Sequence, residues 1–502
     1  MEEKYIAAVD MGTRKTALTV AKISGDDVSI VYYKELPSDG IKNSAVFNPK
    51  KAETPIRTVI EEAEDELKIK IMQVVVGLPR CDVSQEIAQA RVNRTDPDEN
   101  ITQEEVETLK ALAQQDYPLK DEARQILYGA VAQSFSTEEE FQLTENDIIG
   151  VISDTFEGNF KLFIGKKSAV RSIDKIFNGL GIAIAKKYFT PGSQAKAVLT
   201  QDEMQGGVAL VDFGAGATSV TIYQGDILRH YAAIPFGGNT ITGDIMTECG
   251  ISESLAENIK YAYGACMPEK LQTLGEKTIQ IEGSVEEGFK QIPVKYLSEI
   301  ITARVTEIMD AILYEIQCSG LADSLRNGMV ITGGGAKLTN IANYIKEMSG
   351  YNVRIGRPRR KVSADGCPGV FDPTATTSVG MILSAKDDGL AGCIDPAETP
   401  AGKGSFTSGT ELDLGKTTED LSETVPPAET ETQQPAETAG GVLPEDGEEG
   451  TGGSLFPDAP APEPDKGKKK EPKPKKPNAF TITWKKVMDF VDNMTNEMSE
   501  KQ

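Results

Sequence analysis

The sequence predicts an α/β protein in which one strand-and-turn unit occurs twice. Up to about residue 392, apolar strands alternate with helices, which is the pattern of sheets covered by helices. Three strand-like runs end directly at a glycine-containing turn, and they span residues 6–9, 208–212 and 329–332. The first two also carry an aspartate at the strand end, about 200 residues apart. We therefore expect two related halves.

Composition limits the classes of function. A chain of 502 residues is too long for one hydrophobic core and suits two to four subdomains. Its formal net charge of −24 argues against nucleic acid as a partner, because phosphates are neutralised chiefly by Lys and Arg. The six cysteines lie far apart, without a C-x-x-C pair, and His230 is the only imidazole. No zinc site is expected, and such thiols fit a reducing cytoplasm.

The first turn has the composition of a phosphate-binding loop. Gly12 lets the backbone approach a phosphate, while Thr13 and the nearby N–H groups can bind its oxygens. Asp10, at the strand end, can organise the water molecules around a magnesium ion. Taken alone, D-x-G-T is more often an ordinary β-turn, because Asp and Gly are common turn residues.

The second turn, D-x-G-x-G-x-T, makes the first one more specific. It starts at Asp212, its candidate phosphate contacts are Gly214, Ala215, Gly216 and Thr218, and a strand resumes after it. Two strand–Asp–Gly turns would hold phosphates from both sides. This is neither a P-loop nor a dinucleotide fingerprint, because G-x-x-x-x-G-K-[ST] is missing and neither turn opens a helix.

The third turn places Gly333, Gly334, Gly335 and Ala336 between a strand and a helix expected over residues 338–348. Adjacent glycines leave room for a flat base or an α-phosphate at the start of a helix. A tight strand-to-helix turn without any ligand would have the same composition.

Glu257 and Lys260 lie three residues apart on a helix expected to begin near Ser252. The ordinary explanation of this spacing is an ion pair on a solvated helix face. The same two side chains could instead hold ribose hydroxyls and the edge of a purine.

The C-terminal part differs in composition from the rest. Residues 393–477 are rich in Pro, Gly, Ser, Thr and Glu and nearly free of aromatics, which predicts a disordered linker. The linker is acidic over residues 393–465, with 17 acidic residues against two lysines. It turns basic over residues 466–476, with seven lysines against one glutamate.

An amphipathic helix is predicted over residues 478–498. Its apolar residues recur at spacings of four and three, namely Phe480, Trp484, Val487, Val491 and Met494. Lys485 and Lys486 fall on another face. Such a helix can lie among anionic membrane lipids, helped by about 1 kcal/mol for each lysine near the surface. Docking on the protein's own core or in a groove of a partner is the alternative.

The order and spacing of these features resemble a known superfamily. The two phosphate turns, the Glu-x-x-Lys helix and the Gly-Gly-Gly-Ala turn resemble actin, hexokinase and heat-shock-70 proteins. Within that group the chain is similar to the FtsA family of bacterial cell-division proteins over roughly residues 4–392 and the terminal helix. The similar stretches span residues 76–77, 101–105, 147–151, 198–203, 228–230 and 234–239.

The resemblance implies an actin-like, duplicated ribonuclease-H-like fold of two domains around a nucleotide cleft. Four subdomains would follow: 1A at residues 1–81, 164–193 and 357–392; an inserted, family-specific 1C at 82–163; 2A at 194–236 and 321–356; and 2B at 237–320. The linker and the amphipathic helix would follow them.

The implied ligands are ATP and Mg²⁺. Asp10 and Asp212 would hold the metal through water. The phosphates would face Asp10, Gly12, Thr13, Lys15, Gly214, Ala215, Gly216 and Thr218. The nucleoside would be surrounded by Glu257, Lys260, Gly333, Gly334, Gly335 and Ala336. Thr190 stands where several actin-like relatives carry a Glu that positions the attacking water, so at most a weak ATPase is expected. Gln194 and Glu203 are near in sequence, but no pattern places either at the γ-phosphate.

The implied function is an adaptor for cell division. Such a protein polymerises with itself, anchors FtsZ filaments of the Z-ring to the inner face of the cytoplasmic membrane, and recruits later division proteins. FtsZ would bind residues 237–320, and the later proteins would bind the inserted subdomain. The protein would be peripheral at the inner membrane, at the division septum.

Two alternatives remain open from the sequence. One is another actin-like filament or pilus-assembly ATPase, which would share the nucleotide site; the long insertion after Pro79 and the C-terminal anchor favour the FtsA family. The other is a sugar or acetate kinase, which needs a placed acid or base and has no use for a basic, amphipathic tail.

Overall fold

The computed structural model describes residues 3–282, 289–358, 362–364 and 366–394. Nearly all of the linker predicted over 393–477, with its lysine block, lies outside the described residues. So does the predicted helix with its membrane-anchor residues, namely Phe480, Trp484, Lys485, Lys486, Val487, Val491 and Met494. Among the helices of the described ranges, none combines the length and the apolar character that crossing a bilayer requires.

The first domain is built on a six-stranded sheet of order β10-β6-β1-β2-β3-β18. Neighbours β1, β2 and β3 are antiparallel, whereas β6 runs parallel to β1. The carboxyl ends of β1 and β6 therefore lie at the same edge of the sheet. The strands are β1 (Glu3–Met11), β2 (Lys15–Ser24), β3 (Asp27–Pro37), β6 (Gln73–Gly77), β10 (Ala183–Tyr188) and β18 (Ser363–Ala364).

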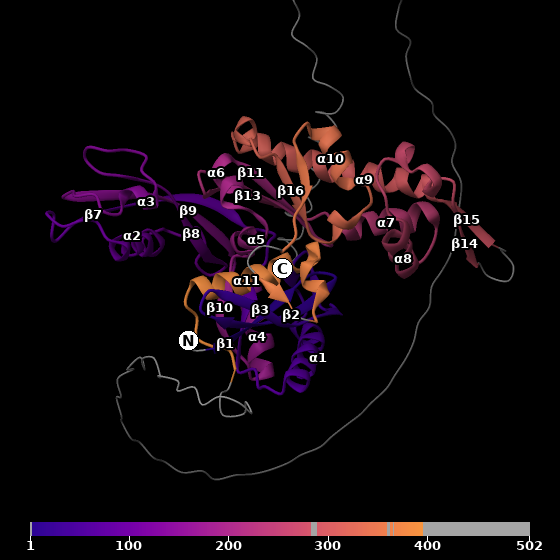
Figure 1. The fold of residues 1–502 in the computed structure, drawn as a ribbon, viewed down its shortest axis with the longest axis horizontal. Coiled ribbons are helices and arrows are strands. Elements are labelled where there is room, and N and C mark those ends of the chain that lie inside the picture. The colour runs from indigo at the N-terminus through magenta and orange to yellow at the C-terminus, as the bar shows by residue number, and fades with distance from the viewer. Residues whose placement is uncertain (1–2, 283–288, 359–361, 365, 395–502) are drawn as a thin grey trace, which may run out of the picture. The chain divides into compact units, whose positions relative to one another are not determined.

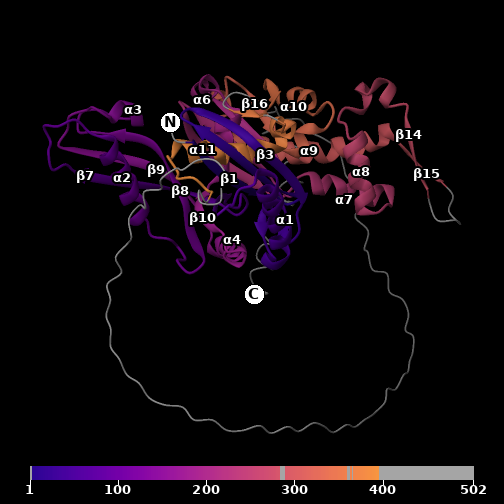
Figure 2. The same ribbon diagram turned by 60° about the horizontal axis from the view of Figure 1, so that its bottom comes forward.

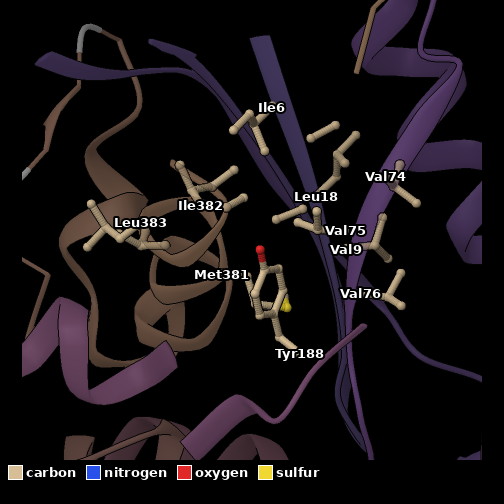
Figure 3. Close-up of a cluster of buried hydrophobic side chains, with 14 of the residues drawn as sticks. Ile6, Val9, Leu18, Val74, Val75, Val76, Tyr188, Met381, Ile382 and Leu383 are labelled. Carbon is tan, nitrogen blue, oxygen red and sulfur yellow. The ribbon is translucent and has the colours of Figure 1, made fainter. Parts of the chain in front are cut away.

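Helices cover this sheet on both faces (Figure 1). Two of them, α1 (Pro49–Leu67) and α4 (Lys167–Leu180), pack together on one face, and α11 (Thr376–Asp387) lies on the other, against α5 (Thr190–Val198). Figure 3 shows Met381 and Ile382 of α11 turned toward strands that carry Ile6, Leu18 and Val75. These side chains are all fully or almost fully buried, so burial of apolar surface fixes α11 on the sheet.

The second domain repeats this plan. Its sheet has the order β13-β12-β11-β16-β17, with an antiparallel meander β11-β12-β13 and β16 parallel to β11. Asp10 and Asp212 each stand one residue before the end of the first strand of their meander. The predicted duplication is thus confirmed. The strands are β11 (Val208–Phe213), β12 (Thr218–Gln224), β13 (Ile227–Ile234), β16 (Met329–Thr332) and β17 (Val353–Ile355).

The helices of the second domain begin close to the predicted positions, with one correction. Ser252 caps α8, as expected. The helix after the third turn begins at Ile341 rather than at residue 338, because Gly334–Lys337 form a 3-10 turn (η4) first. The elements are α6 (Gln201–Gly206), α7 (Gly238–Cys249), α8 (Glu253–Tyr263), α9 (Val294–Cys318), α10 (Ile341–Ser349), and the hairpin β14 (Thr278–Glu282) and β15 (Phe289–Pro293).

The segment predicted as an insertion forms a separate three-stranded sheet of order β7-β9-β8 with its own apolar core. Thr102 and Glu105 form the capping box of its helix α2. Figures 1 and 2 show β7, α2 and α3 on the side of the second sheet away from β14 and β15. The elements are β7 (Ser84–Asn93), α2 (Gln103–Gln115), β8 (Gln125–Ser136), α3 (Glu145–Ile148) and β9 (Thr155–Lys166). This segment is called the insert below.

Short elements complete the described chain. They are β4 (Ile41–Lys42), β5 (Ala45–Val46), η1 (Pro268–Lys270), η2 (Gln272–Leu274), η3 (Ala322–Ser324), η5 (Pro368–Phe371) and η6 (Pro373–Ala375).

Candidate functional site

A cavity of about 780 Å³ is lined by residues of both domains. Its size lies within the range of small-molecule and cofactor sites, roughly 300–1,000 Å³. Twelve of the predicted site residues line it: Asp10, Gly12, Thr13, Lys15, Asp212, Gly214, Ala215, Glu257, Lys260, Gly333, Gly334 and Gly335. The structure thus brings all three glycine turns and the Glu-x-x-Lys helix to one place.

Three predicted residues do not line the cavity. Thr218 is fully buried and donates its hydroxyl to the carbonyl of Phe236 across 2.8 Å, so it holds the second sheet together. Ala336 is 1% exposed and packs in the core of the second domain. A Cβ added to Gly216 would lie 2.6 Å from Thr13 Oγ1. Gly216 therefore lets the first and second turns meet, while the cavity is lined by its neighbours Gly214 and Ala215.

The first two turns are built alike. The N–H of Gly12 donates to the carbonyl of Lys15 across 2.9 Å, and the N–H of Gly214 donates to the carbonyl of Ala217 across 3.0 Å. A Cβ would come within 2.9 Å of the acceptor oxygen at Gly12 and within 2.6 Å at Gly214. Since real Cβ atoms do not approach so closely, both turns require glycine.

The carboxylate of Asp212 is the centre of a buried polar network. Arg80 forms an ion pair with it, and Gln194 Nε2 lies 3.0 Å from its Oδ2. The same Gln194 nitrogen lies 2.9 Å from the hydroxyl of Thr376 and 3.3 Å from that of Thr377. Asp212 and Gln194 are each 3% exposed. Glu203, in contrast, pairs with Arg354 and does not line this cavity.

Asp10 and Asp212 fit a magnesium ion held through water. Both line the cavity and offer carboxylate oxygens, the ligands that magnesium prefers. Burial raises the pKa of Asp10, and the charges of Arg80 and Lys15 offset only part of this rise. A cation beside Asp10 would therefore relieve an unfavourable negative charge. Within the described ranges, no three or more His, Cys, Asp or Glu side chains form a direct metal cage.

Lys15 reaches the cavity with its charge already paired. Its Nζ lies 3.1 Å from the hydroxyl of Tyr33 and contacts the carboxylate of Glu35, which also lines the cavity. Burial of Glu35 opposes its charge, but Lys15, Tyr33 and Thr374 outweigh burial and hold its pKa below the ordinary value. The sequence placed Lys15 at the phosphates and missed this acidic partner.

Glu257 and Lys260 form a shielded ion pair rather than one on a solvated helix face. Lys260 Nζ lies 2.7 Å from Glu257 Oε2, and their side chains are only 12% and 17% exposed. The ammonium also donates to the carbonyl of Gly238 across 2.8 Å and to the hydroxyl of Thr242 across 2.7 Å. Burial lowers the pKa of Lys260, and Glu257 opposes that change. The pair therefore joins α8 to the start of α7 at the cavity.

The third turn requires two of its glycines for close packing. Gly333 has φ +81°, and a Cβ there would lie 2.3 Å from Asp212 Oδ1. A Cβ at Gly335 would lie 2.1 Å from the ring of Phe213. These contacts bring the third turn directly against the end of β11.

Two side chains that the sequence did not single out offer a surface for a flat base. Tyr261 lines the cavity and is 79% exposed. Lys337 Nζ lies 5.7 Å from the centre of the Tyr261 ring and 2.8 Å from Asp372 Oδ2. An exposed aromatic ring can stack on a base, because both present π faces.

Thr190 lines the cavity with an unsatisfied hydroxyl. It is 2% exposed, and its Oγ1 has no hydrogen-bond partner among the described residues. Leaving a buried hydroxyl unpaired costs about 1–3 kcal/mol. A ligand oxygen in the cavity could remove this cost.

Comparison with known proteins identifies relatives of this chain. A family model described as cell division protein FtsA matches residues 209–380, which include the second and third turns and α8. Cell division protein FtsA of Neisseria meningitidis is 29% identical over 390 residues, covering 76% of this chain and 91% of its own length. The protein of the same name from Escherichia coli K12 is 25% identical over 401 residues, covering 78% and 92%.

A similar solved structure is that of a PilM–PilN type IV pilus biogenesis complex. The TM-score is 0.54 at 16% identity, over 76% of this chain and 98% of that chain. At such an identity the likeness concerns the fold alone.

Proposed function

This chain belongs to the FtsA family of cell-division proteins and has an actin-like fold, and on that premise we propose that it binds ATP with magnesium in its interdomain cavity. The observation that carries this proposal is the pair of equivalent glycine turns at Gly12 and Gly214, which face one cavity from two domains. A polyphosphate between them would touch both domains. Binding of the polyphosphate would therefore favour the arrangement in which the two domains lie close together around the cavity.

The side chains have distinct roles in this proposal. Asp10 and Asp212 would hold the water ligands of magnesium, which neutralises phosphate charge when bound. Arg80 offers a planar guanidinium to phosphate oxygens. The Glu257–Lys260 pair would face the ribose, and Tyr261 would stack on the base.

Hydrolysis is proposed to be weak. A general base must be able to take a proton near neutral pH, and Thr190 cannot do so at its alcohol pKa. Gln194 could orient a water molecule through its amide, but that amide already bonds Asp212, Thr376 and Thr377. We assign ATP a structural role, in which it joins the two domains and supports assembly of the chain into filaments.

The proposed cellular role is that of a membrane adaptor for division. The chain would polymerise, hold FtsZ filaments at the inner face of the cytoplasmic membrane through residues 237–320, and recruit later division proteins through the insert. Support comes from family membership and from the sequence of the tail, with its lysine block and the apolar face around Trp484.

Vesicle flotation tests the adaptor role. The full chain should float with anionic vesicles and bring FtsZ filaments with it, whereas Trp484→Glu should leave both behind. Asn493→Glu is the matched control, because on the predicted helix residue 493 would lie opposite Trp484, and it should permit flotation. Equal flotation of Trp484→Glu and the unchanged chain would contradict the anchor.

A pilus-assembly protein is the second candidate function. The PilM–PilN complex shares the fold, which at 16% identity does not assign a function, and the family match over residues 209–380 argues against this candidate. Failure of FtsZ filaments to associate with the vesicle-bound chain would favour this candidate.

A further inference from the structure

The insert contacts the second domain along the free side of strand β13. This strand is at the edge of its sheet, and an edge strand presents backbone groups that need partners. Each strand of the insert supplies one side chain to it: Gln85 from β7, Gln133 from β8 and Lys161 from β9. We call these three residues, with Leu228, Arg229 and Tyr231 of β13, the insert seam.

In the seam, side-chain amides form hydrogen bonds with backbone groups of β13 that a neighbouring strand would otherwise form. Gln85 accepts from the N–H of Tyr231 across 2.9 Å and donates to the carbonyl of the same residue. Gln133 donates to the carbonyl of Leu228 across 3.0 Å, and Arg229 donates back to the carbonyl of Gln133 across 2.9 Å. Beside these hydrogen bonds, the ring of Phe163 on β9 meets the ring of Tyr231 edge-on at 6.3 Å between ring centres, so opening the seam would expose both polar and apolar groups.

Tyr231 connects the seam to the cavity through Arg80. The hydroxyl of Tyr231 donates to the carbonyl of Arg80 across 2.7 Å. The guanidinium of Arg80 pairs with Asp212 in the cavity. One residue therefore carries a cavity ion pair on its side chain and a seam hydrogen bond on its backbone.

A second connection runs through aromatic rings. Phe189 stacks on Phe163 of β9 at 4.5 Å between ring centres and meets Tyr231 edge-on at 5.1 Å. Phe189 directly precedes Thr190, whose unpaired hydroxyl lines the cavity. Both the contact through Arg80 and the ring contacts of Phe189 therefore join the cavity to Tyr231, which is 1% exposed.

We propose that the insert seam couples the insert to the nucleotide cavity, so that bound nucleotide keeps the insert docked on β13. This inference rests on the proposed ATP site. Coupling of binding free energies is reciprocal, so a partner that pulls the insert away from β13 would loosen the nucleotide by the same factor.

Hydrogen exchange of the full chain, with and without ATP and magnesium, tests the coupling. If the seam opens only when the cavity is open, ATP at 100 times its Kd should slow amide exchange at residues 228–232 by up to ~100-fold. Tyr231→Phe keeps the ring but loses the bond to Arg80, and the slowing should fall below ~10-fold while ATP still binds. Tyr223→Phe is the matched control, a buried tyrosine of the neighbouring strand β12, and should behave as the unchanged chain.

The reciprocal arm uses Gln85→Ala, which removes the paired amide contacts of the seam without touching the cavity. It should weaken ATP binding several-fold, as measured by titration calorimetry. If the unchanged chain binds ATP but the amide hydrogen exchange at residues 228–232 does not change, this inference is wrong while the proposed function stands. Absence of ATP binding to the unchanged chain would overturn the proposed function and this inference together.

Discussion

Gln194 of α5 donates its side-chain amide to Asp212 of β11 across 3.0 Å, inside a cavity lined by both domains. The same nitrogen also reaches Thr376 of α11. One neutral side chain thus ties two helices to the aspartate that is proposed to hold magnesium through water.

Replacing Gln194 should therefore destabilise the fold. Gln194→Ala leaves Asp212 and the two threonine hydroxyls short of one buried donor, which costs about 1–3 kcal/mol of unfolding free energy. Gln194→Glu should cost more, because two buried carboxylates would face each other. Urea denaturation measures both. The control is Gln201→Ala, whose exposed amide contacts Asp226 and which should stay within about 0.5 kcal/mol; equal stability of all three variants would refute the network.

The charge of Glu35 should weaken ATP binding. It lines the cavity and neutralises Lys15, so Glu35→Gln should free the lysine for phosphate and tighten ATP binding several-fold at low salt. The gain should shrink in ~0.5 M salt, because screening weakens such interactions. Titration with ATP at two salt concentrations measures the effect. Glu61→Gln, an exposed carboxylate on α1, is the control, and a loss of affinity in Glu35→Gln would contradict the assignment.

The carboxylate of Asp10 should lower the stability of the folded state at neutral pH, although we propose that it helps to bind magnesium. Burial raises its pKa above 3.8, so the folded state binds this proton more tightly than the unfolded state. Stability then falls as the pH rises through the window between 3.8 and the raised pKa, and stays lowered above it. Asp10→Asn should raise Tm at pH 7, with a gain that shrinks as the pH is lowered toward that raised pKa.

The same variant should weaken magnesium-dependent ATP binding. Thermal scans from pH 5 to 8 and ATP titrations with and without magnesium give the two readouts. Asp65→Asn, an exposed carboxylate on α1, should change neither. A lower Tm for Asp10→Asn at pH 7 would show that the carboxylate stabilises the fold.

Gly216 should be needed for the contact between the first two turns. In Gly216→Ala the new Cβ would meet Thr13 Oγ1 at 2.6 Å, so the turns must separate, and ATP affinity should fall at least ~10-fold. Gly243→Ala on α7 is the control, because its Cβ would meet no atom within 4 Å and alanine favours a helix by roughly 0.5–1 kcal/mol. Unchanged affinity in Gly216→Ala would mean that the two turns need not touch.

The sequence predicted the parts of the site that are contiguous in the chain. The turns at Asp10 and Asp212 and the pair Glu257–Lys260 can be recognised because strand, glycine and polar residue follow one another within a few positions. Thr218 and Gly216 belong to the same motif, but a motif cannot distinguish a residue that faces a ligand from one that only shapes the turn.

Gln194 and Arg80 could not be recognised in this way. The partners of Gln194 include Thr376, which is 182 residues later, and no local sequence pattern predicts that contact. One signal could have found Arg80. It follows the end of β6, which runs parallel to β1, and the carboxyl ends of neighbouring parallel strands lie at the same edge of a sheet.

The most direct test of the account is an ATP titration of the full-length chain with and without magnesium. We predict saturable binding of one ATP, tighter with magnesium, and its loss in Gly335→Arg, whose side chain would collide with the ring of Phe213 beside the cavity. Gly243→Arg on α7 is the control and should bind as the unchanged chain does, with circular dichroism confirming that both variants are folded. Saturable ATP binding by folded Gly335→Arg, or none by the unchanged chain, would contradict the assignment of the cavity.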